Sequence, residues 1–103
     1  MFIDPYYRYL DGKISFTRAQ GSNFAKQVAD DFNPLHDAGA TRFCIPGDLL
    51  FAITLARYGL SRHMEFIFSG MVVDGVELVL PEPSPLLHLD DAKGKHYLSV
   101  NRS

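Results

Sequence analysis

The chain has 103 residues, 47% of them hydrophobic and 21% charged, and a formal net charge of −2. A chain of this length holds one domain with a single modest core. Because there is no basic surplus, we expect neither nucleic acid nor a membrane surface as a partner. The sequence contains no run of about eighteen apolar residues, which excludes a transmembrane helix.

The single cysteine, Cys44, cannot form an internal disulfide. The first residues lack the basic stretch, the long apolar run and the small-residue cleavage site of a signal peptide. Both observations are typical of a protein in a reducing compartment, so we expect a cytoplasmic location.

The first third of the chain predicts an arm, a short strand and a helix. Residues 1–12 form an aromatic-rich N-terminal arm that ends in a turn signal, and residues 14–16 are strand-like. Thr17 and Gln20 have the spacing of a capping box, so we expect a helix from there to about residue 30. Pro34 disfavours helical geometry in the residue before it, so the helix must end earlier.

A second helix is expected in the middle of the chain, after a loop over residues 31–46. Residues 49–56 are apolar nearly all round, and Gly59 is a natural stop. A helix of this kind is surrounded by protein rather than laid on a surface. Asp48 is expected to cap its positive end.

The second half predicts strands. Residues 64–68 and 75–80 are strand-like, and three closely spaced prolines then break any regular strand. Residues 86–89 and 96–100 flank a polar turn and predict a hairpin. The order of elements indicates an α+β fold over residues 1–103, a single domain with an antiparallel sheet wrapped around one buried helix.

The candidate active site is the Asp-x-Asn-Pro-x-His turn from Asp31 to His36. Asn33 can bond to its local backbone and Pro34 fixes one dihedral angle, so the turn can hold two side chains in a constant relation. A carboxylate beside an imidazole can orient a water, remove one of its protons and deliver a proton elsewhere. Such general acid–base help is worth on the order of a hundred- to ten-thousand-fold in rate.

The start of the central helix adds a second ingredient. Its free backbone N–H groups near Gly47 and Asp48 could polarise a carbonyl oxygen, an effect worth roughly 3 kcal/mol per donor. From spacing alone, however, the structural interpretation is the commoner one: an Asx turn that ends a helix, followed by a surface histidine.

The stretch over residues 24–36 resembles the signature of MaoC-like (R)-specific enoyl-CoA hydratases and dehydratases. Residues 42–50 are similar to the family's entry into its central helix, and residues 64–78 to the strands that follow. The likeness covers about residues 13–80, and its specific motif is residues 31–36. The resemblance implies a hotdog fold, in which an antiparallel sheet wraps around the buried central helix.

The resemblance also implies an activity, that of a lyase of fatty acid metabolism. Asp31 and His36 would activate the water that adds across the double bond of an acyl thioester, carried by coenzyme A or acyl carrier protein. Asn33 would hold the turn, and a backbone N–H near Gly47 or Asp48 would bind the thioester oxygen. A homodimer is implied, because hotdog sheets generally pair edge to edge, while no cofactor and no metal is expected.

Two departures from the family pattern keep alternatives open. The family usually has a His-Gly pair where this chain has Gly47-Asp48, and a carboxylate there could repel a forming oxyanion. A hotdog sheet has about five long strands, whereas the sequence predicts four, at residues 14–16, 64–68, 75–80 (extending towards 89) and 96–100. We therefore expect an incomplete fold that lacks the family's last strand after residues 100–102, either because the chain is a piece of a longer protein or because a partner chain completes the sheet.

These departures favour a non-catalytic hotdog module for binding or oligomerisation as the alternative. A third interpretation is a thioesterase-like hydrolase, since Asp31 and a water could also attack a thioester carbonyl.

Four other residues are weaker candidates for a catalytic or metal-binding role. Cys44 precedes a helix, where a thiol pKa can fall, but its apolar neighbours favour a buried structural cysteine. His63, His88 and His96 lack metal-ligand spacing, so surface or strand histidines are expected.

The arm and the end of the central helix hold the remaining candidates. Tyr6, Tyr7 and Tyr9 could stack on a ligand, although an arm packed on the domain is commoner. Arg57 and Arg62 could meet a phosphate of coenzyme A, but solvated residues at a helix end are the more common case.

Overall fold

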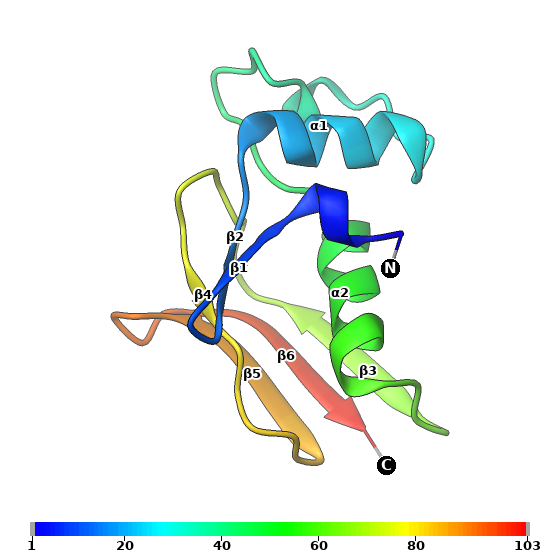
Figure 1. Ribbon diagram of the computed structural model, residues 1–103, viewed down its shortest axis with the longest axis vertical. Helices are drawn as coiled ribbons and strands as arrows, with labels where there is room; N and C mark the ends of the chain where they lie inside the picture. The colour runs from blue at the N-terminus through cyan, green and yellow to red at the C-terminus, as the bar shows by residue number, and fades with distance from the viewer. Residues whose placement is uncertain (1, 103) are drawn as a thin grey trace.

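The computed structural model describes residues 2–102 as an α+β fold, which confirms the predicted class (Figure 1). In this part of the chain one antiparallel sheet of six strands has the order β1-β2-β4-β5-β6-β3. The strands are β1 (Arg8–Leu10), β2 (Lys13–Ser15), β3 (Met64–Phe68), β4 (Leu78–Val79), β5 (Leu86–Asp91) and β6 (His96–Arg102). The helices are α1 (Arg18–Gln27) and α2 (Gly47–Tyr58), with single 3-10 turns η1 (Asp4–Tyr6) and η2 (Pro34–His36).

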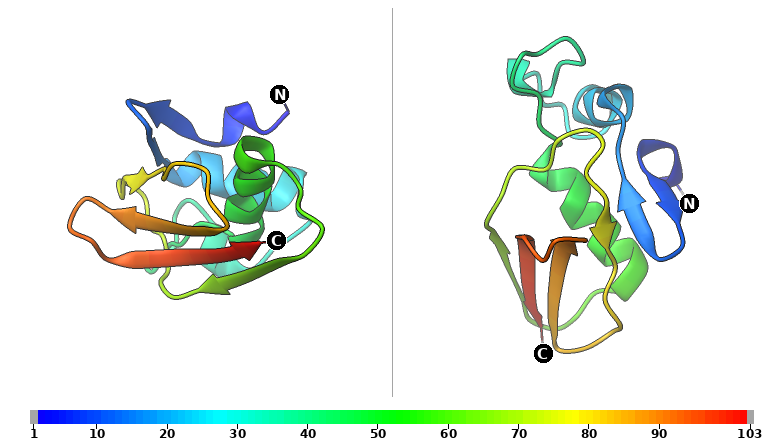
Figure 2. Two further views of the ribbon diagram at one scale, coloured as in Figure 1. Left: turned by 90° about the horizontal axis from the view of Figure 1, so that it is seen from below. Right: turned by 90° about the vertical axis from the view of Figure 1, so that its left-hand side faces the viewer.

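Helix α2 runs along one face of the sheet, and α1 with the following loop lies beyond its N-terminal end (Figures 1 and 2). Alternation along β5 puts Leu87 and Leu89 on the helix side and Leu86 and His88 on the outside. The large, fully buried side chains of the core include Ile3, Ile14, Leu49, Ile53, Leu78, Leu87 and Leu98. Neither helix of the described chain is long and apolar enough to span a bilayer.

Helix α1 begins as predicted. The Thr17 hydroxyl accepts from the backbone N–H of Gln20 at 3.1 Å, and the Gln20 amide oxygen accepts from that of Thr17 at 3.0 Å. The helix ends at Gln27, about three residues earlier than expected. Asp30 has a φ of 52°, which turns the chain sharply and directs Asp31 back towards the helix.

The start of α2 differs from the prediction. The helix begins at Gly47, one residue before Asp48, and Pro46 occupies the cap position without a side-chain hydrogen bond. The expectation that Asp48 caps the helix is therefore wrong, because its side chain already belongs to the first turn. Its carboxylate still lies at the positive end of the helix dipole. Gly59, with a φ of 81°, ends the helix as expected.

Enclosure of α2 is only partial. Leu49, Leu50 and Ile53 are buried, but Phe51 is 42% exposed. Its ring lies 4.7 Å from that of Phe66 on β3, measured between centroids. The apolar pattern all round the helix therefore overstated its burial.

The sheet has more strands than the four that the sequence predicts. Leu86–Asp91 is a strand separate from Leu78–Val79, because the proline-rich segment between them interrupts the chain. The N-terminal arm also supplies a strand: Asp11 and Gly12, both with positive φ, form the two-residue turn that pairs β1 with β2. The predicted count of four strands is therefore too low for the described residues.

Gly21 allows α1 to pack closely against the chain that enters α2. A Cβ added there would lie 2.8 Å from Ile45 Cδ1 and 2.9 Å from Phe43 Cζ, both in the buried core. At Gly47, by contrast, an added Cβ would meet the Phe68 ring at an ordinary 3.5 Å.

We predict that Gly21→Ala lowers the free energy of unfolding by about 1–2 kcal/mol, although alanine favours helices, because the core cannot absorb the extra methyl group. Gly47→Ala is the matched control and should gain up to about 0.5 kcal/mol. Urea unfolding followed by circular dichroism measures both. Equal effects of the two substitutions would contradict this view of α1 packing.

Candidate functional site

Asp31 and His36 face each other across the predicted turn. Asp31 Oδ2 lies 3.4 Å from His36 Nε2, and the two side chains are 38% and 12% exposed. The imidazole is therefore largely enclosed, while one side of the carboxylate reaches solvent. The sequence places these two residues correctly as a pair.

Hydrogen bonds from backbone N–H groups within the turn fix this geometry. The second carboxylate oxygen of Asp31, Oδ1, accepts the N–H of Asn33 at 3.0 Å. The amide oxygen of Asn33 accepts the N–H of Leu35 at 3.0 Å, and its carbonyl accepts the N–H of His36 at 3.0 Å. Asn33 thus holds the turn, as expected, and its side-chain oxygen is used for structure.

The other ring nitrogen of His36 determines the tautomer. His36 Nδ1 lies 2.8 Å from the carbonyl oxygen of Cys44. A carbonyl oxygen only accepts hydrogen bonds, so Nδ1 carries the proton that it donates. In the neutral ring Nε2 then has a free lone pair, and Nε2 lies 3.4 Å from Asp31 Oδ2. Two acceptors 3.4 Å apart can both receive hydrogen bonds from one donor molecule such as water.

Cys44 is buried, and the sequence favours this interpretation of it as a structural cysteine. It is 6% exposed, and its Sγ lies 3.8 Å from His36 Nδ1. Burial raises the pKa of the Cys44 thiol, and the nearby negative charge of Asp31 raises it further. The thiol therefore stays protonated and is a poor nucleophile.

The start of α2 is joined to this pair through Cys44, three residues before Gly47. Gly47 and Asp48 are both exposed, and their N–H groups have no hydrogen-bond partner within residues 2–102. Two donors at a helix start are thus available to an acceptor. The Asp48 carboxylate belongs to the same helical turn.

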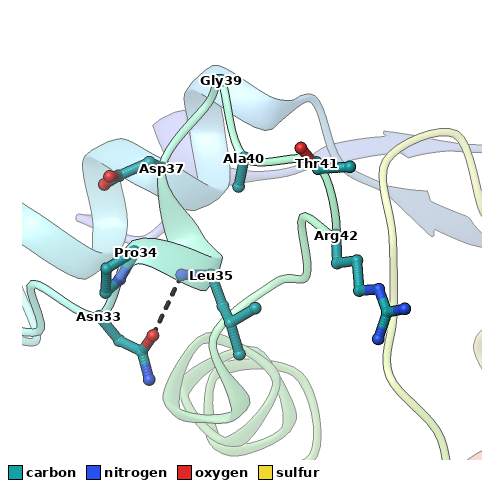
Figure 3. A pocket seen from close by; sticks show the side chains of 8 residues that line it. All are labelled: Asn33, Pro34, Leu35, Asp37, Gly39, Ala40, Thr41 and Arg42. Atoms are coloured by element: carbon teal, nitrogen blue, oxygen red, sulfur yellow. Dashed lines mark hydrogen bonds between the residues drawn. The ribbon is translucent and has the colours of Figure 1, made fainter.

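A hollow of about 650 Å³ adjoins the turn and is drawn in Figure 3. Its lining residues are Asn33, Pro34, Leu35, Asp37, Gly39, Ala40, Thr41 and Arg42. Leu35 and Arg42 come from opposite walls, and the Asn33 amide lies beside Leu35 (Figure 3). Asp31 and His36 do not line it, so the hollow borders the pair rather than containing it.

Two arginines near the hollow were not expected to matter. Arg42 is exposed, and its guanidinium makes no hydrogen bond or ion pair within residues 2–102. Arg18 donates to the carbonyl oxygens of Ala38 at 3.1 Å and Ala40 at 2.6 Å, and its guanidinium lies 5.2 Å from the centre of the Phe43 ring. Arg18 therefore fixes a wall of the hollow. No motif marks either residue, because both roles arise from loop geometry.

The arm tyrosines and Arg57 are engaged with each other. The Arg57 guanidinium carbon lies 4.0 Å from the centre of the Tyr9 ring, and Arg57 Nη2 donates to the Tyr7 hydroxyl at 3.1 Å. The Tyr6 hydroxyl donates to the Gln27 side chain at 3.1 Å. These contacts favour the structural interpretation of the arm.

Two of the histidines lie closer together than their spacing in the sequence predicts. Within residues 2–102 no group of three or more His, Cys, Asp and Glu side chains is arranged to hold a metal ion. His88 and His96, eight residues apart in sequence, nevertheless lie side by side with ring centres 5.2 Å apart. Their spacing in the sequence does not predict this contact, because the register of β5 and β6 brings the two rings together.

The comparison with known families identifies the chain only at the level of a family. Residues 1–103 match the family model described as "Protein of unknown function (DUF3581)". The chain belongs to this family. A search of curated proteins finds no match to it. The site of this DUF3581 protein must therefore be interpreted from its own geometry.

We predict that iodoacetamide alkylates Cys44 more slowly in the folded DUF3581 chain than in urea, because burial and Asp31 both raise the thiol pKa. Asp31→Asn removes the charge contribution and should accelerate the reaction at about pH 8. Asp30→Asn is the matched control, because asparagine tolerates the positive φ of that position. Mass spectrometry measures the rates, and equal rates for the two variants would be incompatible with this electrostatic coupling.

Proposed function

We propose that this chain is a hotdog-fold, MaoC-like domain that binds acyl thioesters and hydrates or dehydrates them. The observation that carries the proposal is the Asp31–His36 pair, with Nε2 and Oδ2 3.4 Å apart and the His36 tautomer set by Cys44. An antiparallel sheet on a central helix supports the hotdog assignment. The coenzyme A or acyl carrier protein substrate, the cytoplasmic location and the homodimer belong to the same proposal. The edge position of β3 is compatible with sheet pairing between subunits.

The pair would act on a water molecule. One O–H of the water donates to His36 Nε2 and the other to Asp31 Oδ2, which directs an oxygen lone pair outward. As that oxygen bonds to the β-carbon of an enoyl thioester, one water proton passes to the pair and a proton is delivered to the α-carbon. The thioester is thereby hydrated with no net change in the pair. The reverse sequence removes water from a 3-hydroxyacyl thioester.

The surroundings of the pair suggest where the substrate would lie. The free N–H groups of Gly47 and Asp48 can stabilise negative charge on the thioester oxygen as the α-carbon accepts its proton. Leu35 supplies apolar surface beside the pair, and the unpartnered Arg42 guanidinium can hold a phosphate of the carrier. Each of these groups is exposed, so a substrate could reach them without a large movement of the backbone.

One observation favours a second candidate function, a non-catalytic binding or oligomerisation module. The Asp48 carboxylate belongs to the same exposed helical turn as the two free N–H groups. A negative charge there opposes a developing oxyanion, although it does not prevent a neutral thioester from binding. In this alternative the Asp31–His36 turn serves structure alone.

Hydration of crotonyl-CoA, followed by the loss of absorbance of the enoyl thioester, separates the two candidates. We expect activity in the parent chain and a decrease of on the order of a hundredfold or more in both Asp31→Asn and His36→Ala. Asp48→Asn should raise the rate, because it removes a charge that opposes the oxyanion. Asp30→Asn, with the neighbouring carboxylate neutralised, should leave the rate unchanged.

Inactivity of the parent, or equal activity in all variants, would contradict the hydratase proposal. Binding of crotonyl-CoA by an inactive parent would then support the binding module. Release of free thiol from crotonyl-CoA in place of hydration would indicate the thioesterase-like reaction.

A further inference from the structure

The outer face of the β5–β6 hairpin, turned away from α2, carries a compact polar cluster. In the register of the two strands His88 pairs with Ser99 and Asp90 with His96. A regular ladder continued from His88 would place Tyr97 opposite Asp90, but a bulge between Leu89 and Asp90 shifts the pairing by one residue. This shift turns Tyr97 into the core and brings His96 beside His88.

Each imidazole is held at Nδ1 by a neighbour on the opposite strand. His96 Nδ1 lies 2.6 Å from Asp90 Oδ1, and a carboxylate that only accepts requires the Nδ1–H form of the neutral ring. His88 Nδ1 lies 3.0 Å from the Ser99 hydroxyl, which can accept from the same tautomer. Both rings can therefore present an unprotonated Nε2, and neither Nε2 has a partner within residues 2–102.

The two rings are separated by a distance that suits one shared metal ion. Their centres lie 5.2 Å apart with an angle of 38° between the ring planes. Two imidazoles bound to one tetrahedral ion, with metal–nitrogen bonds of about 2.0–2.1 Å, have ring centres roughly 5 Å apart. The His96 side chain is 60% exposed, so an ion can reach the pair from solvent.

We propose that His88 and His96 bind one divalent transition-metal ion of the zinc type through their Nε2 atoms. Imidazole nitrogen suits Zn²⁺ better than Mg²⁺ or Ca²⁺, which prefer oxygen. Asp90 and Ser99 act on the Nδ1 side, where a carboxylate or hydroxyl fixes the tautomer and orientation of a ligating histidine. Water completes the coordination, because no third protein ligand gathers there in the described chain.

Binding at this place would join the two longest strands of the sheet. The ion would link β5 to β6 at the bulge, where the ladder of backbone hydrogen bonds is irregular. A ligand that binds only the folded state stabilises it, so Zn²⁺ should raise the melting temperature of the chain. This site is separate from the Asp31–His36 pair and does not depend on the proposed function.

The test is a titration of the tag-free chain with ZnCl₂ by isothermal calorimetry, repeated with CoCl₂ to read coordination from the visible absorption of Co²⁺. We expect one ion per chain. His88→Asn and His96→Asn should each abolish binding, and Asp90→Asn should weaken it by about tenfold or more through loss of the carboxylate behind the ligand.

Two controls keep the result specific. His63→Asn removes an exposed histidine elsewhere and should not alter binding. His36→Ala removes the imidazole beside Cys44 and should leave metal binding unchanged, which shows that this region is not the metal site. Far-ultraviolet circular dichroism confirms that each variant is folded. The proposal is overturned if the parent binds neither ion, or if the His88→Asn/His96→Asn double variant, folded, still binds Zn²⁺ as tightly as the parent.

Discussion

Burial of an extended stretch of backbone, residues 43–46, is the constraint on which this structure depends. Peptide groups in the interior must be paired, because an unpaired one costs about 1–3 kcal/mol. The Cys44 N–H donates to the Leu35 carbonyl at 3.1 Å, and the Ile45 N–H donates to the Val72 carbonyl at 2.8 Å. The Cys44 carbonyl receives its hydrogen bond from a side chain, the Nδ1 of His36.

The contact between His36 Nδ1 and the Cys44 carbonyl contributes both to the fold and to the geometry of the candidate site. The same hydrogen bond that satisfies a buried carbonyl also fixes the tautomer of His36, whose Nε2 lies 3.4 Å from Asp31 Oδ2. The buried stretch in turn depends on Gly21, which lets it pack against α1, and leads directly into α2. The imidazole is thus oriented by the fold itself, which is the preorganisation that the proposed hydration would require.

Features governed by local rules could be predicted from the sequence, whereas those set by register could not. The capping box at Thr17, the glycine stop after α2 and the facing of Asp31 and His36 all follow from short-range chemistry. The pairing of His88 with His96 depends on a bulge, and the role of Arg18 depends on how a loop folds over α1; neither leaves a periodic signal. The strand count failed for a similar reason, because only the pairing with β2 reveals the strand in the N-terminal arm.

The tautomer of His36 is the most direct test of this account. The nitrogen NMR spectrum of the labelled imidazole, recorded at alkaline pH where the ring is neutral, distinguishes a protonated nitrogen from an unprotonated one. We predict that Nδ1 carries the proton, that Nε2 is unprotonated, and that Asp31→Asn preserves this pattern because the Cys44 carbonyl enforces it. A proton on Nε2 in the folded chain would contradict both the bond to Cys44 and the water-handling geometry built on it.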